Sequence, residues 1–551
     1  MKKYLTNFVT KGKTPQNQPM SGTNQVRNSA GGYSFALDQW DQLKRFLVLG
    51  SEGGSYYASE SKLTVENATN VLHCIETDGL RTVNEIVAIS KDGRAPKNDP
   101  AIFALALCAS AGNDETRKAA LNALPDVCRI GTHLFTFAET IKGMRGWGRG
   151  LRRAVGAWYT IKDERKLAYQ LVKYRQRGGW THTDTLRLAH PTPVNTTQDA
   201  LFKWVTKRDE AEWVKATETP EDNALAFVWA FEQAQRATDV KTVLKLIADY
   251  DLPREAIPTQ MLKDPAIWEA LLVKMPMTAM IRNLGTMSRN GFLTAHSDAE
   301  KTIVERLTDV NRLQKARVHP IAVLSALTVY KLGYSLRGRG NQYGRLTHQS
   351  GAEWTPTARV MDALDKAFEL SFKNVRPANK RTMVALDVSG SMTMGMIAGV
   401  AGLTPRVGSA AMAMVTMRTE PDYSTMAFTD KLVPLDISAK MRLDDVLKAV
   451  SGLRFGRTDC AQPMIYALKN KLNVDTFVIY TDNETWAGGQ HPVEALREYR
   501  QKMSIPARLI VVGMVSNGFT IADPSDSGML DVVGFDSAAP ALMADFSRGD
   551  L

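Results

Sequence analysis

Cysteine is scarce in this sequence of 551 residues, which holds only four. Cys74, Cys108, Cys128 and Cys460 form no CxxC pair and have no metal-ligand spacing, so reduced thiols are expected rather than a disulfide framework. No uncharged apolar run approaches the length of a membrane span. The N-terminus begins basic but lacks the apolar core of a signal peptide. We therefore expect a cytoplasmic protein without a membrane partner.

Familiar catalytic motifs are missing as well. The sequence contains no GxxxxGKS or GxxxxGKT phosphate loop, no HExxH and no Ser-His-Asp nucleophile elbow. These absences argue against phosphoryl transfer by a phosphate loop and weaken an enzymatic function in general. A binding protein rather than an enzyme is the expectation.

Acidic residues are under-represented in one part of the chain. The whole sequence has 69 Lys and Arg against 58 Asp and Glu. Residues 381–551 hold 16 basic and 19 acidic residues, so by subtraction residues 1–380 hold 53 and 39, a net charge of +14. Because the basic excess belongs entirely to the first part, that part is expected to bind a polyanion such as nucleic acid.

Three different sequence patterns follow one another along the chain. Residues 1–32, rich in Gly, Asn, Gln, Ser, Thr and Pro from residue 10 onward, predict a flexible N-terminal arm. Residues 33–374 show apolar residues at three- and four-residue spacing, which predicts short helices stacked as a solenoid, although no strict repeat is found. In residues 375–551 strand runs alternate with helix runs, which predicts a parallel sheet with helices on both faces.

Oxygen donors follow the ends of two predicted strands. Asp387, Ser389 and Ser391 come after the apolar run 382–386, and Asp482 comes after the run 476–480. In open α/β sheets ligands bind outside the carboxyl ends of the strands. With Thr458 from a further loop, two carboxylates and three hydroxyls favour Mg²⁺, Ca²⁺ or Mn²⁺ over zinc. The alternative is a strand-end turn whose hydroxyls only cap a helix.

The densest basic region is residues 129–190, with thirteen Lys and Arg against four acidic residues and three of the eight histidines. Lys173 and Arg177 are predicted to be i, i+4 neighbours on one helix, with Arg175 beside them. Gly178-Gly179 is predicted to end that helix. Arg offers bidentate contact to phosphate, which makes this helix a candidate RNA contact.

The segment after those glycines predicts a second contact. Thr181 to Asp184 has the pattern of a capping box, so a helix is expected to begin there. Its positive N-terminus, with His182 and Arg187, forms a candidate phosphate site. The Gly/Arg run 336–340 with Arg345 is a weaker candidate. The alternative for both is an ordinary solvated surface, although the shortage of balancing acids argues against it.

The order DxSxS, Thr, Asp in residues 375–551 resembles the von Willebrand factor A domain and its metal-ion-dependent adhesion site. In this family five residues bind one cation. An open coordination position on the cation then takes an acidic group from a partner. The resemblance assigns these roles to Asp387, Ser389, Ser391, Thr458 and Asp482, with Mg²⁺ as the expected ion. A departure from close relatives stands before Thr458, where Gly456-Arg457 replaces smaller residues.

The chain as a whole resembles the Ro autoantigen family, including its bacterial members, in which a TROVE domain precedes a von Willebrand factor A domain. The segments that carry the resemblance are residues 46–57, 127–137, 173–180, 481–485, 487–492 and 516–524. The resemblance implies an all-α, HEAT-like ring of helical repeats over residues 33–374. It also implies a doubly wound α/β domain over residues 375–551 that holds the ring closed.

The Ro resemblance further implies an RNA-binding ribonucleoprotein core for noncoding-RNA quality control. Small Y RNAs would bind the outer basic surface, and single-stranded 3′ ends of misfolded RNA would enter a central hole. Nuclease activity would lie in a partner exoribonuclease such as polynucleotide phosphorylase. The RNA contacts expected on this basis are Lys173, Arg175, Arg177, His182 and Arg187, with Arg129 and His133 at the hole. The alternative for the last two is that Arg129 pairs with Asp126 and His133 caps a helix.

Two other functions stay open from the residues alone. A metal-dependent protein-interaction scaffold would make the basic surface incidental. A metal-dependent hydrolase would use the oxygen site for two-metal chemistry, although one or two carboxylates are few for that purpose.

Overall fold

The computed structural model describes residues 13–208, 211–334, 353–372, 375–397, 403–453 and 456–550. Among these, residues 68–334 and 353–371 form one compact unit, called here the helical unit, and residues 13–67 and 372–550 form the mixed unit. No helix in the described part of the chain is both long and apolar enough to cross a membrane.

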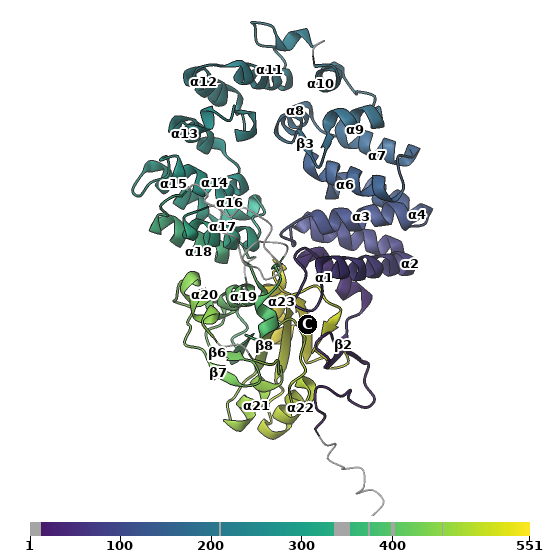
Figure 1. Cartoon of the computed structure of the whole chain (residues 1–551), viewed down its shortest axis with the longest axis vertical. Helices are drawn as coiled ribbons and strands as arrows, with labels where there is room; N and C mark the ends of the chain where they lie inside the picture. Colours follow the sequence, from purple (N-terminus) through teal and green to yellow (C-terminus); the bar gives the residue numbers. More distant parts are fainter. Residues whose placement is uncertain are drawn as a thin grey trace, which may run out of the picture. The chain divides into compact units, whose positions relative to one another are not determined.

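The helical unit consists of helices joined by short turns (Figure 1). Its first half contains most of α2 (Glu60–Asp92), α3 (Asp99–Ala111), α4 (Asp114–Asn122), α5 (Leu124–Val127), α6 (Gly131–Met144), α7 (Arg149–Thr160), α8 (Glu164–Lys173), α9 (His182–Ala189) and α10 (Thr196–Thr206). Its second half contains α11 (Asn223–Arg236), α12 (Val240–Tyr250), α13 (Pro265–Lys274), α14 (Met277–Arg289), α15 (Asp298–Leu307), α16 (Val310–Lys315), α17 (Pro320–Leu332) and α18 (Ala358–Leu370). The predicted all-α architecture is confirmed.

Side-chain caps set where many of these helices begin. The carboxylate of Asp163 accepts a hydrogen bond from the backbone N–H of Lys166 at the start of α8. Asp239 does the same for Thr242 at the start of α12, and Asp264 does so at α13. Such caps satisfy N–H groups that have no partner inside the helix, which fixes the helix start.

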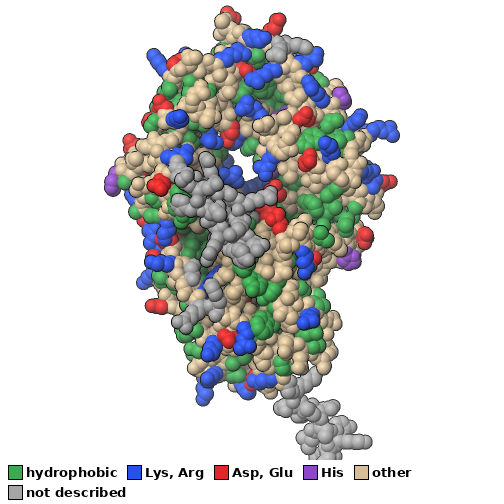
Figure 2. Space-filling view, in the orientation of Figure 1, with side chains coloured by type: hydrophobic (Ala, Val, Ile, Leu, Met, Phe, Trp, Pro, Cys, Tyr) green, Lys and Arg blue, Asp and Glu red, His purple; other side chains and the backbone are tan. Residues whose placement is uncertain are grey.

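The first and last parts of the helical unit contact each other. The ring Nε2 of His319 lies 2.9 Å from the carbonyl oxygen of Arg94, while its Nδ1 accepts from the backbone N–H of Ile321 at the start of α17. Because Nδ1 accepts, Nε2 carries the proton and donates to Arg94. The visible face of this unit is hollowed, and Lys and Arg side chains lie at the edge of the hollow (Figure 2). The series of helices and the contact between the first and last parts of the unit both agree with the predicted ring.

The core of the mixed unit is a six-stranded sheet in the order β11-β9-β8-β5-β6-β7. The strands are β5 (Thr382–Asp387), β6 (Tyr423–Phe428), β7 (Leu432–Pro434), β8 (Thr476–Thr481), β9 (Arg508–Gly513) and β11 (Met529–Val533). All neighbours are parallel except β6 and β7. Every residue of β5 and β8 is buried, as expected for strands covered on both faces.

Helices cover both faces of this sheet. They are α1 (Gln39–Leu49), α19 (Pro405–Thr419), α20 (Leu443–Ser451), α21 (Gln462–Lys469), α22 (Pro492–Met503) and α23 (Ala539–Arg548). On one face Met464 of α21 and Leu496 of α22 pack with Met383, Phe477 and other residues of alternating strand positions. On the other face the hydroxyl of Tyr480 is 2.9 Å from that of Thr416 in α19. The predicted doubly wound α/β fold is confirmed.

The N-terminal segment was predicted to be a flexible arm, but its described part, residues 13–32, is held by hydrogen bonds to the rest of the mixed unit. β1 (Gln25–Arg27) pairs with β2 (Tyr33–Ala36), which pairs in turn with β10 (Phe519–Thr520). Gln16, with no exposed surface, donates from Nε2 to the Asp459 carboxylate at 2.6 Å and to the carbonyl of Gln490 at 2.8 Å. Part of the polar composition, at Gln16 and Asn28, therefore serves buried hydrogen bonds.

Candidate functional site

Asp387 is the last residue of β5 and is completely buried. Its Oδ1 accepts from the backbone N–H of Ser389 at 2.9 Å, which folds the following loop back over the strand end. The hydroxyls of Ser389 and Ser391 are 3.0 Å apart. Three predicted metal ligands, Asp387, Ser389 and Ser391, therefore stand together in one turn.

Asp482 comes to the same place from the neighbouring strand. β5 and β8 are parallel with Leu386 opposite Tyr480, so the residues after them emerge side by side. The hydroxyl of Thr481 donates to Oδ2 of Asp387 at 2.7 Å. The carboxylate of Asp482 is hydrogen-bonded to the Ser391 hydroxyl. The predicted approach of two strand-end carboxylates is thus observed.

Thr458 and Asp459 lie in a third buried loop of the same unit. The carbonyl of Thr458 accepts from the backbone N–H groups of Trp486 and Ala487, 3.1 and 3.0 Å away, which ties its loop to the loop after β8. Asp459 is held by Gln16, Gln462 and the N–H of Ala461. Its carboxylate is therefore engaged in structure, whereas Thr458 is the ligand predicted from this loop.

Buried negative charge is the main electrostatic feature of these loops. Burial, and next the charge of Asp482, raise the pKa of Asp387, and burial raises the pKa of Asp482. Glu484, also buried, has its pKa raised to about 7 by burial and by Asp482. Arg406 is a cation whose charge acts on Asp387. Carboxylates packed this way are relieved by a bound cation.

The donor set fits a hard divalent ion that takes mainly neutral ligands. Within the described residues no group of three or more His, Cys, Asp or Glu side chains is placed to hold a metal. Binding would thus depend on the hydroxyls of Ser389, Ser391 and Thr458 together with Asp387 and Asp482. Oxygen-only ligands suit Mg²⁺, Ca²⁺ or Mn²⁺.

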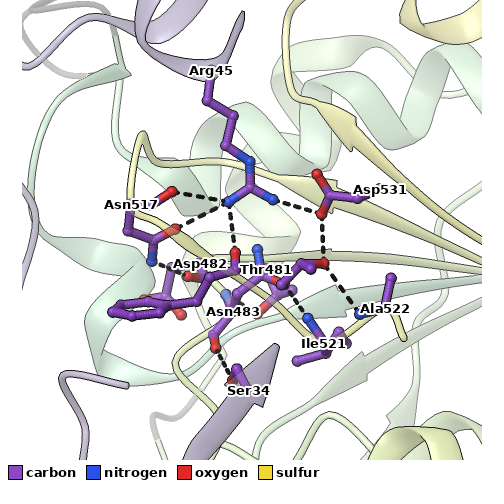
Figure 3. A network of polar contacts seen from close by, with 11 residues as sticks. Ser34, Arg45, Thr481, Asp482, Asn483, Asn517, Ile521, Ala522 and Asp531 are labelled. Carbon is purple, nitrogen blue, oxygen red and sulfur yellow. Dashed lines mark hydrogen bonds and ion pairs between the residues drawn. The ribbon is translucent and has the colours of Figure 1, made fainter. Parts of the chain in front are cut away.

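A buried arginine outside the predicted motif supports the Asp482 loop (Figure 3). Arg45 of α1 donates to Oδ1 of Asn517 at 3.1 Å and to Oδ1 of Asp531 at 2.5 Å. Asn517 in turn donates from Nδ2 to the carbonyl of Asp482 at 2.7 Å. The close approach of Arg45 leaves no room for a side chain at Gly513, where an added Cβ would lie 2.7 Å from the guanidinium carbon.

Tyr57 also reaches this region from the N-terminal part of the mixed unit. Its hydroxyl is hydrogen-bonded to Ser391, and the charges of Asp482 and Glu484 act on it. Its loop packs on the segment after the Ser391 turn, because an added Cβ at Gly53 would lie 2.8 Å from Met396. Residues before position 68 therefore help to build the candidate metal site.

The basic segment folds differently from the prediction. α8 ends at Lys173, and residues 176–181 form a hairpin of β3 (Gln176–Arg177) and β4 (Trp180–Thr181). Gly178 and Gly179 both have positive φ, 57° and 83°, so they form the tight turn rather than a helix end. Arg177 is therefore on a hairpin, not one turn beyond Lys173 on a helix.

Three cations on and before this hairpin remain accessible. Arg175 and Arg177 are exposed, and Lys173 is half-buried. The ammonium of Lys173 donates to the Tyr169 hydroxyl at 2.9 Å, and the guanidinium of Arg175 lies 5.1 Å from the ring centre of Phe231. These aromatic contacts hold the side chains while leaving charge at the surface.

The prediction for His182 is corrected by its burial. The capping box of Thr181 and Asp184 is present, but His182 points into the core, with Nδ1 2.8 Å from the Tyr159 hydroxyl. Burial lowers the pKa of His182 to about 3, so the ring is neutral and shielded from solvent. It cannot contact a phosphate at the surface. The exposed side chains of this helix are Arg187 and, at its end, His190.

Arg129 and His133 are partly buried next to each other and near Arg177. Arg129 donates to the Ser90 hydroxyl at 2.8 Å and to the carbonyl of Asp126 at 3.0 Å. Burial, then Arg129, and more weakly Arg177, lower the pKa of His133 to about 4. Arg317 acts on Arg129 in the same sense. The structure thus gathers cations of both predicted RNA sites.

The contacts of Arg129 and His133 bear on the two alternatives for these residues. Arg129 donates to the backbone carbonyl of Asp126, whereas the Asp126 carboxylate pairs with Lys91 at 3.1 Å, so the alternative of an ion pair between Arg129 and Asp126 is wrong. The cap at the start of α6 is Ile130, whereas the His133 ring is hydrogen-bonded to the backbone of Val127, the last residue of α5, which agrees with the alternative that His133 caps a helix. The Gly/Arg run 336–340 with Arg345 lies outside the described residues.

Comparison with known proteins gives matches to both parts of the chain. The TROVE domain model matches residues 26–345, and the Ro60 vWA domain model matches residues 381–547. A Deinococcus radiodurans protein named "RNA-binding protein RO60" is 42% identical over 542 residues, covering 98% of both chains. The chain belongs to the Ro60 family.

A Caenorhabditis elegans protein of the same name is 37% identical to this Ro60-family chain over 610 residues, covering 98% of this chain and 92% of the other. The crystal structure of the Deinococcus radiodurans RO (RSR) protein has a TM-score of 0.68 at 41% identity, covering 93% of this chain and 100% of that one. The predicted family and fold are confirmed.

Several site residues of this Ro60-family chain were missed from the sequence. Glu484 was visible only as part of a family segment, and Arg45 only as a charge within an apolar helix face. The latter is a usable signal, because a charged residue on a buried face is nearly always paired. Gln16 and Tyr57 carry no such signal, since their partners lie more than 300 positions away in the sequence.

Proposed function

We propose that this Ro60-family protein binds RNA through the basic surface of its helical unit. The observation that carries the proposal is the group of accessible cations Lys173, Arg175, Arg177 and Arg187 in a region of thirteen basic and four acidic residues. Both relatives described above are named RNA-binding proteins. Accessible arginines without balancing acids are the expected footprint of phosphate binding.

The finer proposal distinguishes two kinds of RNA. Small noncoding Y RNAs would lie on the outer surface at Lys173, Arg175, Arg177 and Arg187. Single-stranded 3′ ends of misfolded RNA would pass Arg129 and His133, whose neighbours Arg177 and Arg317 add positive charge. Supporting this idea, the helical unit is hollowed and its edge carries Lys and Arg (Figure 2).

The same proposal gives the chain a place in noncoding-RNA quality control in the cytoplasm. Without a catalytic motif in the sequence, degradation would be carried out by a partner exoribonuclease of the polynucleotide phosphorylase kind. The candidate metal site would hold Mg²⁺ on Asp387, Ser389, Ser391, Thr458 and Asp482. An electrophilic ion with few anionic ligands would then receive an acidic group from a partner protein, which keeps a metal-dependent interaction as a second function.

A salt titration of RNA binding tests the RNA-binding proposal. Each phosphate contact contributes roughly 0.7–0.9 to the slope of log affinity against log salt. The variant Lys173→Ala, Arg175→Ala, Arg177→Ala should bind structured RNA more weakly and with a slope reduced by about two units.

The matched control removes the same charge elsewhere on the helical unit. Lys241, Lys245 and Lys301 are all exposed, and their replacement by Ala should leave the slope nearly unchanged. Equal effects of the two triple variants would mean that only net charge matters. No effect of the first variant, with folding intact, would overturn the assignment of these residues.

A further inference from the structure

A pocket of about 440 Å³ lies within the helical unit among α8, α12, η4 (Arg254–Ala256), α13 and α14. All of its lining residues belong to the described part of this unit. Neither the predicted RNA contacts, apart from Lys173, nor the metal loops lie in it. Its volume is within the range of pockets that hold drug-sized ligands.

The floor of the pocket is apolar and includes an aromatic ring. Leu252, Leu271 and Met275 are almost fully buried there, and Ile247 lines it as well. Tyr169 is half-buried, and its ring centre lies 6.1 Å from that of Phe227 behind it. An aromatic side chain supported from behind is a rigid surface on which a flat ring can stack.

Cations predominate at the pocket. Arg165, Lys173, Arg254 and Lys274 face only two acids, Asp251 and Glu255. The ammonium of Lys274 is 2.6 Å from the Asp251 carboxylate, so this pair neutralises itself. Arg165, Lys173 and Arg254 then stand against one acid, Glu255, whose charge acts on Lys173.

One of these cations has an unused hydrogen-bond donor. The Nε–H of Arg254 is buried and has no acceptor among the residues that the structure describes. Buried donors are nearly always paired, so an unpaired one next to a pocket is a place where a ligand oxygen would be stabilised. Arg165, by contrast, already donates to the carbonyl of Tyr250 at 3.1 Å and packs on Phe227.

We infer that this pocket is a nucleotide-binding site, in which a base stacks on Tyr169 and its phosphate is held by Lys173 and Arg254. The ligand needs a flat, mostly apolar ring and one or two negative charges, and a nucleotide has both. Because Lys173 belongs both to the pocket and to the proposed RNA surface, the nucleotide is assigned to an unpaired position of bound RNA. In that respect the inference rests on the proposed function.

An acidic peptide would match the charge of the pocket but not its flat aromatic floor. Stacking on an aromatic side chain is tolerant of base identity, so any of the four bases should enter. The pocket would then anchor an unpaired base of an otherwise structured RNA, which is the part of RNA that proteins read most directly.

The direct test is calorimetric titration of the full-length protein with AMP, adenosine and ribose 5-phosphate. AMP should bind at least tenfold tighter than either fragment. Tyr169→Ala should weaken AMP binding by roughly 5- to 150-fold, the fold-change that corresponds to loss of one base stack. Tyr169→Phe keeps the ring and should stay within about threefold of the parent. Ala279→Trp keeps every charge, fills the pocket and should abolish binding.

The second arm uses single-stranded RNA containing 4-thiouridine, with crosslinked peptides identified by mass spectrometry and total RNA affinity measured in parallel. A crosslink to the peptide containing Tyr169 that disappears in Ala279→Trp supports an RNA nucleotide as the occupant. AMP binding without the crosslink would assign the pocket to a free nucleotide and overturn the RNA part.

The two arms separate failure of the pocket from failure of the proposed function. RNA bound with full affinity but no AMP binding and no crosslink at Tyr169 would overturn the pocket and leave the RNA-binding function standing. AMP binding as expected, with no RNA binding at any salt concentration, would overturn the RNA-binding function and leave the nucleotide pocket standing. AMP binding that is unchanged in both Tyr169→Ala and Ala279→Trp would place the nucleotide elsewhere and overturn the inference.

Discussion

His182 illustrates how one buried residue can carry a pH dependence unrelated to ligand binding. Its ring contacts Tyr159 by a hydrogen bond and lies near Phe135 and Trp158, with ring centres 4.8 and 6.3 Å away. Burial lowers its pKa from 6.5 to about 3. The neutral ring is therefore part of the folded helical unit, and protonation opposes folding.

The sign of the effect follows from the protons bound by the two states. Below pH 6.5 the unfolded chain is protonated at His182, whereas the folded chain is protonated there only below about pH 3. The free energy of unfolding therefore falls as pH falls through this interval. Between pH 7.5 and pH 5 the loss should be about 2 kcal/mol from this group. His182→Gln cannot titrate, and its unfolding free energy, measured in urea, should fall less over the same interval.

A remainder of pH dependence is expected in that variant, because the pKa of His133 is also lowered, to about 4. Identical pH dependence in the parent and in His182→Gln would contradict a buried neutral histidine. The sequence pattern around His182 predicted the capping box correctly but not the direction of this side chain. Direction depends on Tyr159 and Trp158 of α7, which a local motif does not contain.

The candidate metal site was predicted to the extent that its residues are local to strand ends. Asp387, Ser389 and Ser391 follow one buried strand, and Asp482 follows its neighbour, so pattern and topology alone bring them together. Arg45 and Asn517 were not predictable in this way. Their hydrogen bond joins positions 472 residues apart, and nothing in the local sequence of either names the other.

At the scale of elements, the strands of the sheet were the most predictable part and the short hairpin the least. β5 and β8 are buried along their whole length and leave a continuous apolar run in the sequence. β3 and β4 have two residues each, too few for a period, and Gly178-Gly179 terminates helices as readily as it makes a turn. The N-terminal strands were not predicted, because a segment rich in Gly, Asn, Gln, Ser, Thr and Pro has the same composition whether it is a flexible arm or is held by buried polar contacts.

The N-terminal strands give a prediction about Gly32. An added Cβ there would lie 2.0 Å from the carbonyl oxygen of Thr485 and 2.8 Å from the Cα of Trp486. Both contacts are backbone, so Gly32→Ala must displace β2 from the loop after β8. The mixed unit should lose about 1–3 kcal/mol of stability, measured by thermal unfolding, and trypsin should cut faster after Arg27.

Gly489 provides the matched control for that change. It is exposed, lies in the same loop region, and an added Cβ would meet nothing within 4 Å. Gly489→Ala should leave the melting temperature and the rate of trypsin cleavage unchanged. Equal behaviour of the two variants would mean that residues 13–36 do not depend on their contacts with the loops.

For the whole molecule, the metal should be studied in the full chain rather than in residues 375–551 alone, because Gln16 and Arg45 lie outside that range and support its loops. A ligand that binds only the folded state raises its stability by linkage. Mg²⁺ should therefore raise the melting temperature of the full chain. Asp387→Asn, which removes one of the two carboxylates in the predicted ligand set, should abolish this increment without lowering the metal-free value.

Asp249→Ala, at an exposed acid of α12, serves as the control and should retain the whole increment. Mn²⁺ and Ca²⁺ provide parallel titrations, since the oxygen donors suit all three ions. Absence of stabilisation by every one of them would contradict a functional metal site at these loops.

At the scale of the helical unit, we expect its hollow to select among RNA ends. The charges of Arg129 and Arg177 act on His133, the charge of Arg317 acts on Arg129, and His319 joins the two ends of the unit at Arg94. A hollow whose edge carries Lys and Arg side chains among others admits a single strand more readily than a duplex, whose strands are held together at full width. We therefore expect tighter binding of duplex RNA with a single-stranded 3′ tail than of a blunt duplex of equal length. Gel shifts with matched RNAs, including a 5′-tailed duplex, measure the preference, and the purified chain should leave all of them intact with Mg²⁺. Equal affinity for tailed and blunt RNA would refute threading, and cleavage that disappears in Asp387→Asn would instead favour a metal-dependent hydrolase.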